Sequence, residues 1–261
     1  MNLVPEHIKR LHRLVKHRSG VASVDNYSLV DLIKSVDVNY ASRSLTRPEL
    51  TWSDPVEVVD SLAKRSHRPV ATSRALEASL GTSFALFPAL PSDVSRALEV
   101  LCKVIAGLDH YLLRAPDAPG LSVLVQSRNS AQHKFLSLPE VTDPSCYAER
   151  AHEICRLAAL IFSDMVVLPF PPESLVKPRL ARKLLDQLQA LPEDIWSMES
   201  SHVASGFLSW AMILSGIAEF PTEMRDAFVE IGRKPRILMI YGTWGVEPNL
   251  GDISVVGLCL P

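Results

Sequence analysis

The sequence predicts an all-α protein, an irregular multi-helix bundle, and leaves a short β-like C-terminal tail open. Apolar residues recur at spacings of three and four along several segments, which is typical of helices buried on one face. Strands and helices do not alternate along the chain, so no parallel sheet is expected. Hydrophobic residues make up 47% of the chain and charged residues 21%, a composition that indicates a globular protein with a sizeable core.

The N-terminal region predicts an amphipathic helix over residues 6–18. Ile8, Leu11, Leu14 and Val15 fall at helical spacing and form its apolar face. The other faces are strongly basic, with Lys9, Arg10, Arg13, Lys16 and Arg18. A solvated basic face is the simpler interpretation of this charge pattern, and a nuclear-localisation or phosphate-binding segment is the alternative.

A second short helix is expected at residues 26–36, before a region of different composition. Prolines and small polar residues interrupt the chain from Ser42 to Pro91, so we expect loops there, with one short helix over residues 56–64. The interrupting prolines are Pro48, Pro55, Pro69, Pro88 and Pro91.

The strongest helical signals follow. Ser92 is predicted to cap a helix of about five turns that ends near Pro116. A polar helix is expected over residues 126–138. Residues 147–168 are apolar nearly all round at their centre, which predicts a helix buried by several neighbours and stopped at Pro169.

The C-terminal region predicts three further helices and a change of pattern. Pro178 opens the first, whose leucines form one apolar face. The other two are expected over residues 201–219 and 222–231. Strand-like composition then occurs at residues 237–241 and 254–258.

Three segments carry a resemblance to a known family. They read Arg-Asn-Ser-Ala-Gln-His-Lys-Phe-Leu-Ser-Leu-Pro at 128–139, Cys-Arg-Leu-Ala-Ala-Leu-Ile-Phe-Ser at 155–163 and Leu-Pro-Phe-Pro-Pro at 168–172. The helix begun by Pro178 and the helix containing Trp210 continue the series. This resembles the fungal-specific transcription factor domain, the helical regulatory region that follows the zinc cluster and linker in fungal zinc-cluster regulators.

The resemblance implies a single helical domain over residues 1–261. Its core would span residues 92–232, with a divergent N-terminal part at 1–91 and a divergent tail at 233–261. The six closely spaced cysteines of the family's DNA-binding module do not occur in the sequence. The resemblance therefore implies a transcription-regulator-like protein that binds a protein partner or a small-molecule effector, lacks its own DNA-binding module, and leaves a homodimer open.

Charge and cysteine usage limit the remaining functions. A formal net charge of −2 gives no basis for direct nucleic-acid binding, because phosphate neutralisation supplies most of that affinity. No pair among the four cysteines has zinc-site spacing, so neither a metal nor a cofactor is expected; they are Cys102, Cys146, Cys155 and Cys259. No apolar run is long enough to span a bilayer. We expect a soluble protein of the nucleus or cytoplasm.

Enzymatic motifs are not evident in the sequence. It contains no His-Glu-x-x-His pair, nucleophile elbow, phosphate-binding loop or dinucleotide-binding turn. Asp109-His110-Tyr111 could hold a general base beside a phenol, but no partner is visible. The alternative function is an enzyme or small-molecule carrier of a fungal biosynthetic pathway that reuses the regulatory fold.

Five residues are candidates for a ligand site. Arg156 and Asp164 lie eight residues apart on one face of the 147–168 helix, and each needs a partner when buried. Gln132 and His133 on the preceding helix could supply hydrogen bonds, and His110 could face them. A structural polar network is the simpler interpretation. Convergence around an enclosed volume would favour a ligand site, whereas separate core contacts would favour a scaffold.

Overall fold

The computed structural model describes residues 4–51, 91–116, 118–142, 144–166, 176–191 and 211. No strand occurs within these residues, and their regular structure is helical, which confirms the all-α prediction. The helices are α1 (Val4–His17), α2 (Tyr27–Ser44), α6 (Ser92–Leu112), α7 (Leu121–Ser137), α8 (Tyr147–Val166) and α9 (Val176–Gln189), with a 3-10 turn η1 (Val21–Ser23).

Several expected elements lie outside the described residues. Among them are the helices predicted at 56–64 and 222–231, and the strand-like segments at 237–241 and 254–258. Of the helix predicted over residues 201–219, only Ala211 is described, and it is helical and buried.

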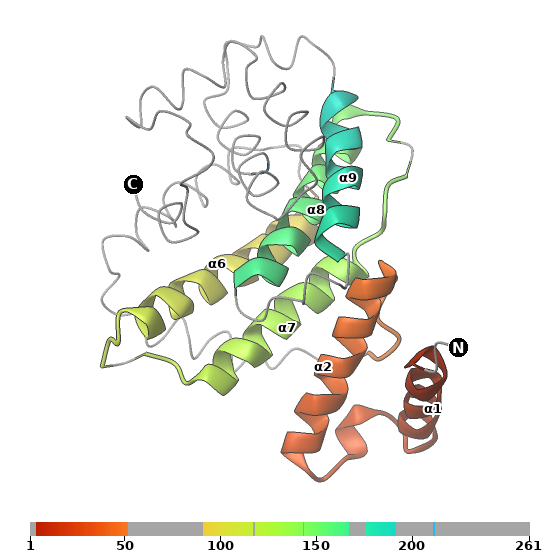
Figure 1. Cartoon of the computed structure of the whole chain (residues 1–261), viewed down its shortest axis with the longest axis vertical. Helices are drawn as coiled ribbons and strands as arrows, with labels where there is room; N and C mark the ends of the chain where they lie inside the picture. The colour runs from red at the N-terminus through yellow and green to blue at the C-terminus, as the bar shows by residue number, and fades with distance from the viewer. Residues whose placement is uncertain are drawn as a thin grey trace.

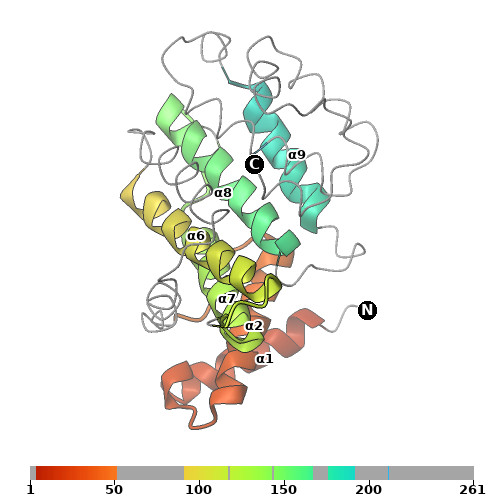
Figure 2. The ribbon, with the colours of Figure 1, turned by 90° about the vertical axis from the view of Figure 1, so that its left-hand side faces the viewer.

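Helix α7 occupies the middle of the described bundle. It contacts α6 and α8 on one side and α2 on another, while α9 packs along α8 (Figure 1). Helix α1 lies at the edge, where it contacts α2 and stands apart from α8 and α9 in both views (Figures 1 and 2). The N-terminal helix therefore reaches the bundle through α2 and the segments next to it.

The main core surrounds α8, as the sequence predicts for its most apolar segment. Every residue from Ile154 to Asp164 is buried. Apolar side chains of α6, α7 and α9 pack around this helix, including Leu101, Phe135 and Leu184. Because neighbours cover α8 on several sides, a continuous apolar surface is stable there.

A second, smaller core holds the N-terminal region. It consists of Val15, Val21, Ile33 and Leu50, with partly buried Leu11, Val24 and Val30 packed against them. This cluster is separate from the main core. Among the described residues, few apolar side chains pack against α1, so its polar contacts with these residues carry more weight.

Two helices are longer than their sequence patterns predicted. Helix α2 continues to Ser44, eight residues past the expected end, because Val38 and Ala41 reach the main core. It begins where Asn26 accepts a hydrogen bond from the Leu29 amide. Helix α7 begins five residues earlier than expected, at Leu121, because Leu124 is fully buried.

Helix starts also differ in detail from the prediction. Ser92 is the first helical residue of α6 rather than its cap, since the Pro91 carbonyl accepts the Ser95 amide at 3.1 Å. Helix α9 begins at Val176, which puts Pro178 inside the first turn. Proline is tolerated there because first-turn amides have no partner within the helix.

Candidate functional site

The polar cluster that docks α1 is built around His12. On α1, Val15 and Leu11 belong to the small core that contains Ile33 of α2, and buried His12 lies on the same inner face. The ring is only 2% exposed, so its two nitrogens meet protein groups rather than solvent. An imidazole in this position needs polar partners, because an unpaired buried polar group is costly.

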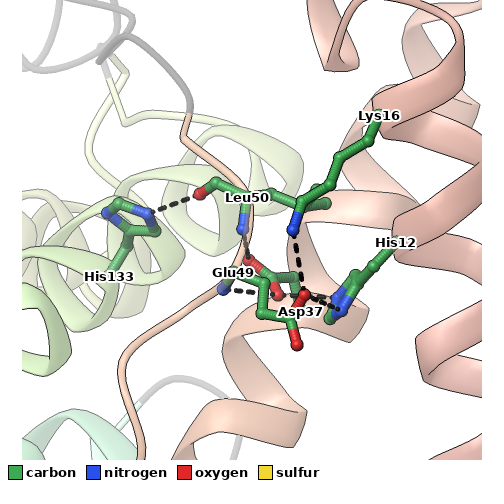
Figure 3. A network of polar contacts seen from close by, with 6 residues as sticks. All are labelled: His12, Lys16, Asp37, Glu49, Leu50 and His133. Carbon is green, nitrogen blue, oxygen red and sulfur yellow. Dashed lines mark hydrogen bonds and ion pairs between the residues drawn. The ribbon is translucent and has the colours of Figure 1, made fainter.

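Two carboxylates supply those partners, one at each ring nitrogen (Figure 3). Nε2 lies 2.9 Å from Oδ1 of Asp37 on α2, and Nδ1 lies 3.2 Å from Oε2 of Glu49. Neither ring nitrogen forms an aligned hydrogen bond, so both are close polar contacts. Lys16 also reaches Glu49, at 3.3 Å. We call these four residues the α1 clamp.

Asp37 connects the clamp to the segment after α2. Its two oxygens accept the backbone amides of Glu49 and Leu50, each at 3.2 Å. Burial raises the pKa of Asp37, while the amide of Leu50 and the charge of His12 act in the opposite direction. On the other side of the segment, Nε2 of His133 from α7 lies 3.1 Å from the Leu50 carbonyl (Figure 3).

The outer face of α1 is basic and open to solvent. Its exposed cations are Lys9, Arg10, Arg13, Lys16 and, just past the helix, Arg18. Glu6 is the acidic residue on this face, and it contacts Arg13 at 3.2 Å and Arg10 at 3.8 Å. Leu14 lies among these residues and is 60% exposed. The clamp thus holds a positively charged surface with an apolar residue in it.

A second polar cluster lies between α2, α7 and α8, around Arg128. The guanidinium is 1% exposed and donates from Nε to the Ser163 carbonyl at 3.2 Å. Nη1 donates to the side-chain oxygens of Asn129 at 3.1 Å and Asn39 at 3.4 Å. Nη2 faces Oδ1 of Asp164 at 3.9 Å. Burial lowers the pKa of Arg128 to about 10, while the charge of Asp164 acts to raise it. The guanidinium is therefore still charged at neutral pH.

Hydrogen bonds between side chains extend this cluster along the α2–α7 interface. Asn129 donates to Ser35 at 2.7 Å, and Gln132 donates to Ser42 at 2.6 Å. Three buried oxygens on these helices have no hydrogen-bond partner among the described residues: Ser127 Oγ, Gln132 Oε1 and Ser163 Oγ. Orphaned buried oxygens in a polar interior are sites where a water or a small polar molecule can bind.

A third cluster fixes the connection between α7 and α8. Glu153 accepts two hydrogen bonds from Arg156, at 2.9 Å and 2.6 Å, and a third from the Val141 amide at 3.2 Å. Beside it, Nε2 of His152 lies 3.0 Å from the Pro139 carbonyl. The bidentate geometry makes this a strong charge-assisted pair that anchors the loop to α8.

The five candidate ligand residues are distributed over separate parts of the bundle. Gln132 contacts α2 and His133 contacts the segment after α2. Asp164 belongs to the Arg128 cluster, whereas Arg156 pairs with Glu153. His110 is buried on α6. Arg156 and Asp164 are about 12 Å apart along α8, from eight residues at 1.5 Å each. Arg156 lies nearer to Glu153, and Asp164 lies nearer to Arg128, than the two lie to each other.

Sequence reasoning did not select the central residues of these clusters. His12 carried one signal, its place between Leu11 and Val15 on the inner face of an amphipathic helix. Arg128 carried none, because the run of polar residues at 127–130 reads as a solvated surface and is in fact buried. Periodicity indicates which residues share a face, but it does not indicate how many faces a neighbour covers.

No protein-family model, curated protein or solved structure gives a significant match to the chain. Among the described residues, no group of three or more histidine, cysteine, aspartate or glutamate side chains is arranged to hold a metal ion. In the same residues, no helix has both the length and the apolar character needed to cross a membrane.

Proposed function

We propose that this chain is a transcription-regulator-like protein whose helical domain binds an acidic segment of a protein partner through the outer face of α1. The regulatory class rests on the resemblance over residues 90–232. The mode of action rests on one observation, the exposed cations of a helix whose inner face is fixed by the α1 clamp. A helix held in place presents its charges with little loss of conformational entropy on binding.

The charge distribution favours a short acidic segment over a nucleic acid. Residues 6–18 carry five cations and one glutamate, a net charge of +4. Since the whole chain has a formal charge of −2, the remainder carries −6. A long polyanion such as duplex DNA would meet this negative remainder, whereas a short acidic segment would meet α1 alone. Exposed Leu14 offers an apolar contact beside the charges.

Fluorescence anisotropy with defined probes tests this proposal. The probes are a labelled peptide of glutamate, aspartate and leucine, and a labelled DNA duplex, each at about 0.15 M salt. We expect the full-length protein to bind the peptide more tightly than the duplex. The Lys9→Glu/Arg13→Glu variant is expected to lose about tenfold in peptide affinity, because rim charges steer association.

A matched control separates local charge from net charge. Arg96→Glu/Arg182→Glu makes the same change in net charge at exposed positions of α6 and α9. The control variant should bind the acidic peptide as the wild type does. Equal losses in the two variants, or duplex binding as tight as peptide binding, would refute partner binding through α1.

The second candidate function, a small-molecule effector site or a carrier, is favoured by the orphaned oxygens in the Arg128 cluster. Ser127 Oγ, Gln132 Oε1 and Ser163 Oγ are buried and have no hydrogen-bond partner among the described residues. A small polar ligand that donates a hydrogen bond would satisfy Gln132 Oε1, and either a donor or an acceptor would satisfy the two hydroxyls. Native mass spectrometry of the full-length protein tests this candidate. A co-purifying mass that is lost in Ser163→Ala supports it, and a bare protein mass opposes it.

A further inference from the structure

We propose that Ser19 is a phosphorylation site for a basophilic protein kinase, and that the added phosphate weakens the binding of an acidic partner to α1. The modification stands on its own observations, whereas its consequence rests on the proposed function of the outer face of α1. Ser19 lies in the turn between α1 and α2, directly after Arg18, the last cation of that face. In both views this turn lies at the end of the described bundle that is far from α9 (Figures 1 and 2).

The first ground is the shape of the turn that presents Ser19. Past the end of α1, the amides of Ser19 and Gly20 still donate to carbonyls of the last helical turn, at 3.2 and 3.0 Å. Both residues have positive φ angles, 65° and 101°, which turn the chain away from the helix. Ser19 is exposed, and the space beside the α-carbon of Gly20 is open. A kinase can therefore reach the hydroxyl group from solvent.

The second ground is the set of cations before Ser19. Lys16 precedes it by three residues and Arg18 by one, and both are exposed. Basophilic kinases select serines that follow cations, because complementary charges in the substrate groove favour such segments. Lys16 also contacts Glu49 at 3.3 Å, but its side chain is 61% exposed, so a kinase can still reach its charge.

Two other exposed hydroxyl groups differ from Ser19 in these features. The Ser23 hydroxyl donates to the Gly20 carbonyl at 2.8 Å, and Gly20 stands at the position where Ser19 has its lysine. Thr46 follows Arg43 by three residues, but it lies past the end of α2 rather than at the end of α1. Ser19 thus joins exposure and preceding cations to a place beside the basic face.

The modification is a phosphoryl transfer from a nucleoside triphosphate that the kinase binds with Mg²⁺. The Ser19 oxygen forms a bond to the γ-phosphorus, the bond from that phosphorus to the bridging oxygen breaks, and nucleoside diphosphate leaves. The hydroxyl proton passes to the catalytic base of the kinase. Phosphate carries a charge of about −2 at pH 7, so the net charge of residues 6–19, with five cations and one glutamate, falls from +4 to about +2.

The phosphate changes the charge of the outer face and leaves the α1 clamp on the inner face in place. Lys16 and Arg18 attract the dianion, which offsets its unfavourable position at the C-terminal end of a helix. The Lys9→Glu/Arg13→Glu variant changes the local charge by four and is expected to lose about tenfold in peptide affinity. A change of two therefore predicts a loss of about threefold.

Treatment of the full-length protein with a basophilic kinase tests the site. The probe is the catalytic subunit of the cyclic-AMP-dependent protein kinase with Mg-ATP, and peptide mass mapping locates the phosphate. We expect phosphate at Ser19, at a rate that falls about tenfold in Lys16→Gln/Arg18→Gln. Lys9→Gln/Arg10→Gln, which removes the same charge farther from the serine, should keep the wild-type rate. Absence of phosphate at Ser19, or equal rates in the two variants, would overturn the site.

Anisotropy with the labelled acidic peptide tests the consequence. The phosphorylated protein should bind about threefold more weakly than the untreated protein. Ser19→Asn is the control, since asparagine tolerates a positive φ, and kinase treatment should leave its peptide affinity unchanged. Unchanged affinity of the Ser19-phosphorylated protein would refute the regulatory effect and leave the proposed function standing. Failure of the untreated protein to bind the peptide would refute the proposed function and this effect together, while the mass map still decides on the site.

Discussion

The guanidinium of Arg128 on α7 faces the carboxylate of Asp164 on α8 at 3.9 Å, and both side chains are almost fully removed from solvent. This pair connects the two helices that form the centre of the bundle. Hydrogen bonds from Arg128 to the Ser163 carbonyl and to Asn39 extend the connection to α2. The cluster therefore contributes to the relative placement of three helices, not to one contact alone.

Removal of Arg128 is expected to destabilise the protein strongly. Arg128→Met preserves much of the side-chain volume but leaves the Asp164 charge buried without its cation. The free energy of unfolding in urea should fall by about 3–5 kcal/mol. The matched control is Arg179→Met, since Arg179 is exposed and donates to the Arg43 carbonyl at 2.7 Å. A loss no larger than that of the control would show that the cluster does not stabilise the fold.

Glu153 is expected to stabilise the α7–α8 connection through its charge. Glu153→Gln keeps the shape of the side chain but removes the carboxylate that holds buried Arg156 through two hydrogen bonds. The free energy of unfolding should fall by about 2 kcal/mol, and amide exchange near Val141 should accelerate. Glu99→Gln, at an exposed position on α6, is the control and should change neither quantity.

The raised pKa of Asp37 predicts that the stability of the protein depends on pH. Because burial raises its pKa above 3.8, its stabilising contribution is present below that pH and is lost as pH rises through the folded-state pKa. The wild type should therefore lose stability relative to Asp37→Asn as pH rises from about 4 toward neutrality. Urea unfolding of both proteins across this range measures the difference. An increase in the relative stability of the wild type would show that pairing outweighs burial.

The cysteines should differ sharply in reactivity. Burial raises the pKa of the Cys155 thiol on α8, and the thiolate is the reactive form. Cys146 is exposed in the loop before α8. Native alkylation followed by peptide mass mapping should therefore modify Cys146 rapidly and Cys155 only after unfolding. Alkylation of Cys155 at the rate of Cys146 under native conditions would show that α8 is accessible to solvent.

Several parts of the structure could be predicted from the sequence because they depend on local spacing. The centre of α8 is apolar nearly all round, and every residue from Ile154 to Asp164 is buried. The inner face of α1 also follows from Leu11 and Val15, whereas Leu14, which was expected on the same face, is 60% exposed. Helix ends were less predictable. Helix α2 continues to Ser44 because Val38 and Ala41 meet the main core, a contact with residues distant in the chain.

The sequence by itself determined the helical class, most of the apolar faces and the basic charge of α1, since each depends on residues within a few turns of one another. The tertiary structure decided the polar partners. His12 meets Asp37 across 25 residues, and Arg128 meets Asp164 across 36. Only packing brings such residues together, and the cost of burying a lone charge then determines which of them pair. For that reason Arg156 and Asp164, which share a helix, belong to different clusters.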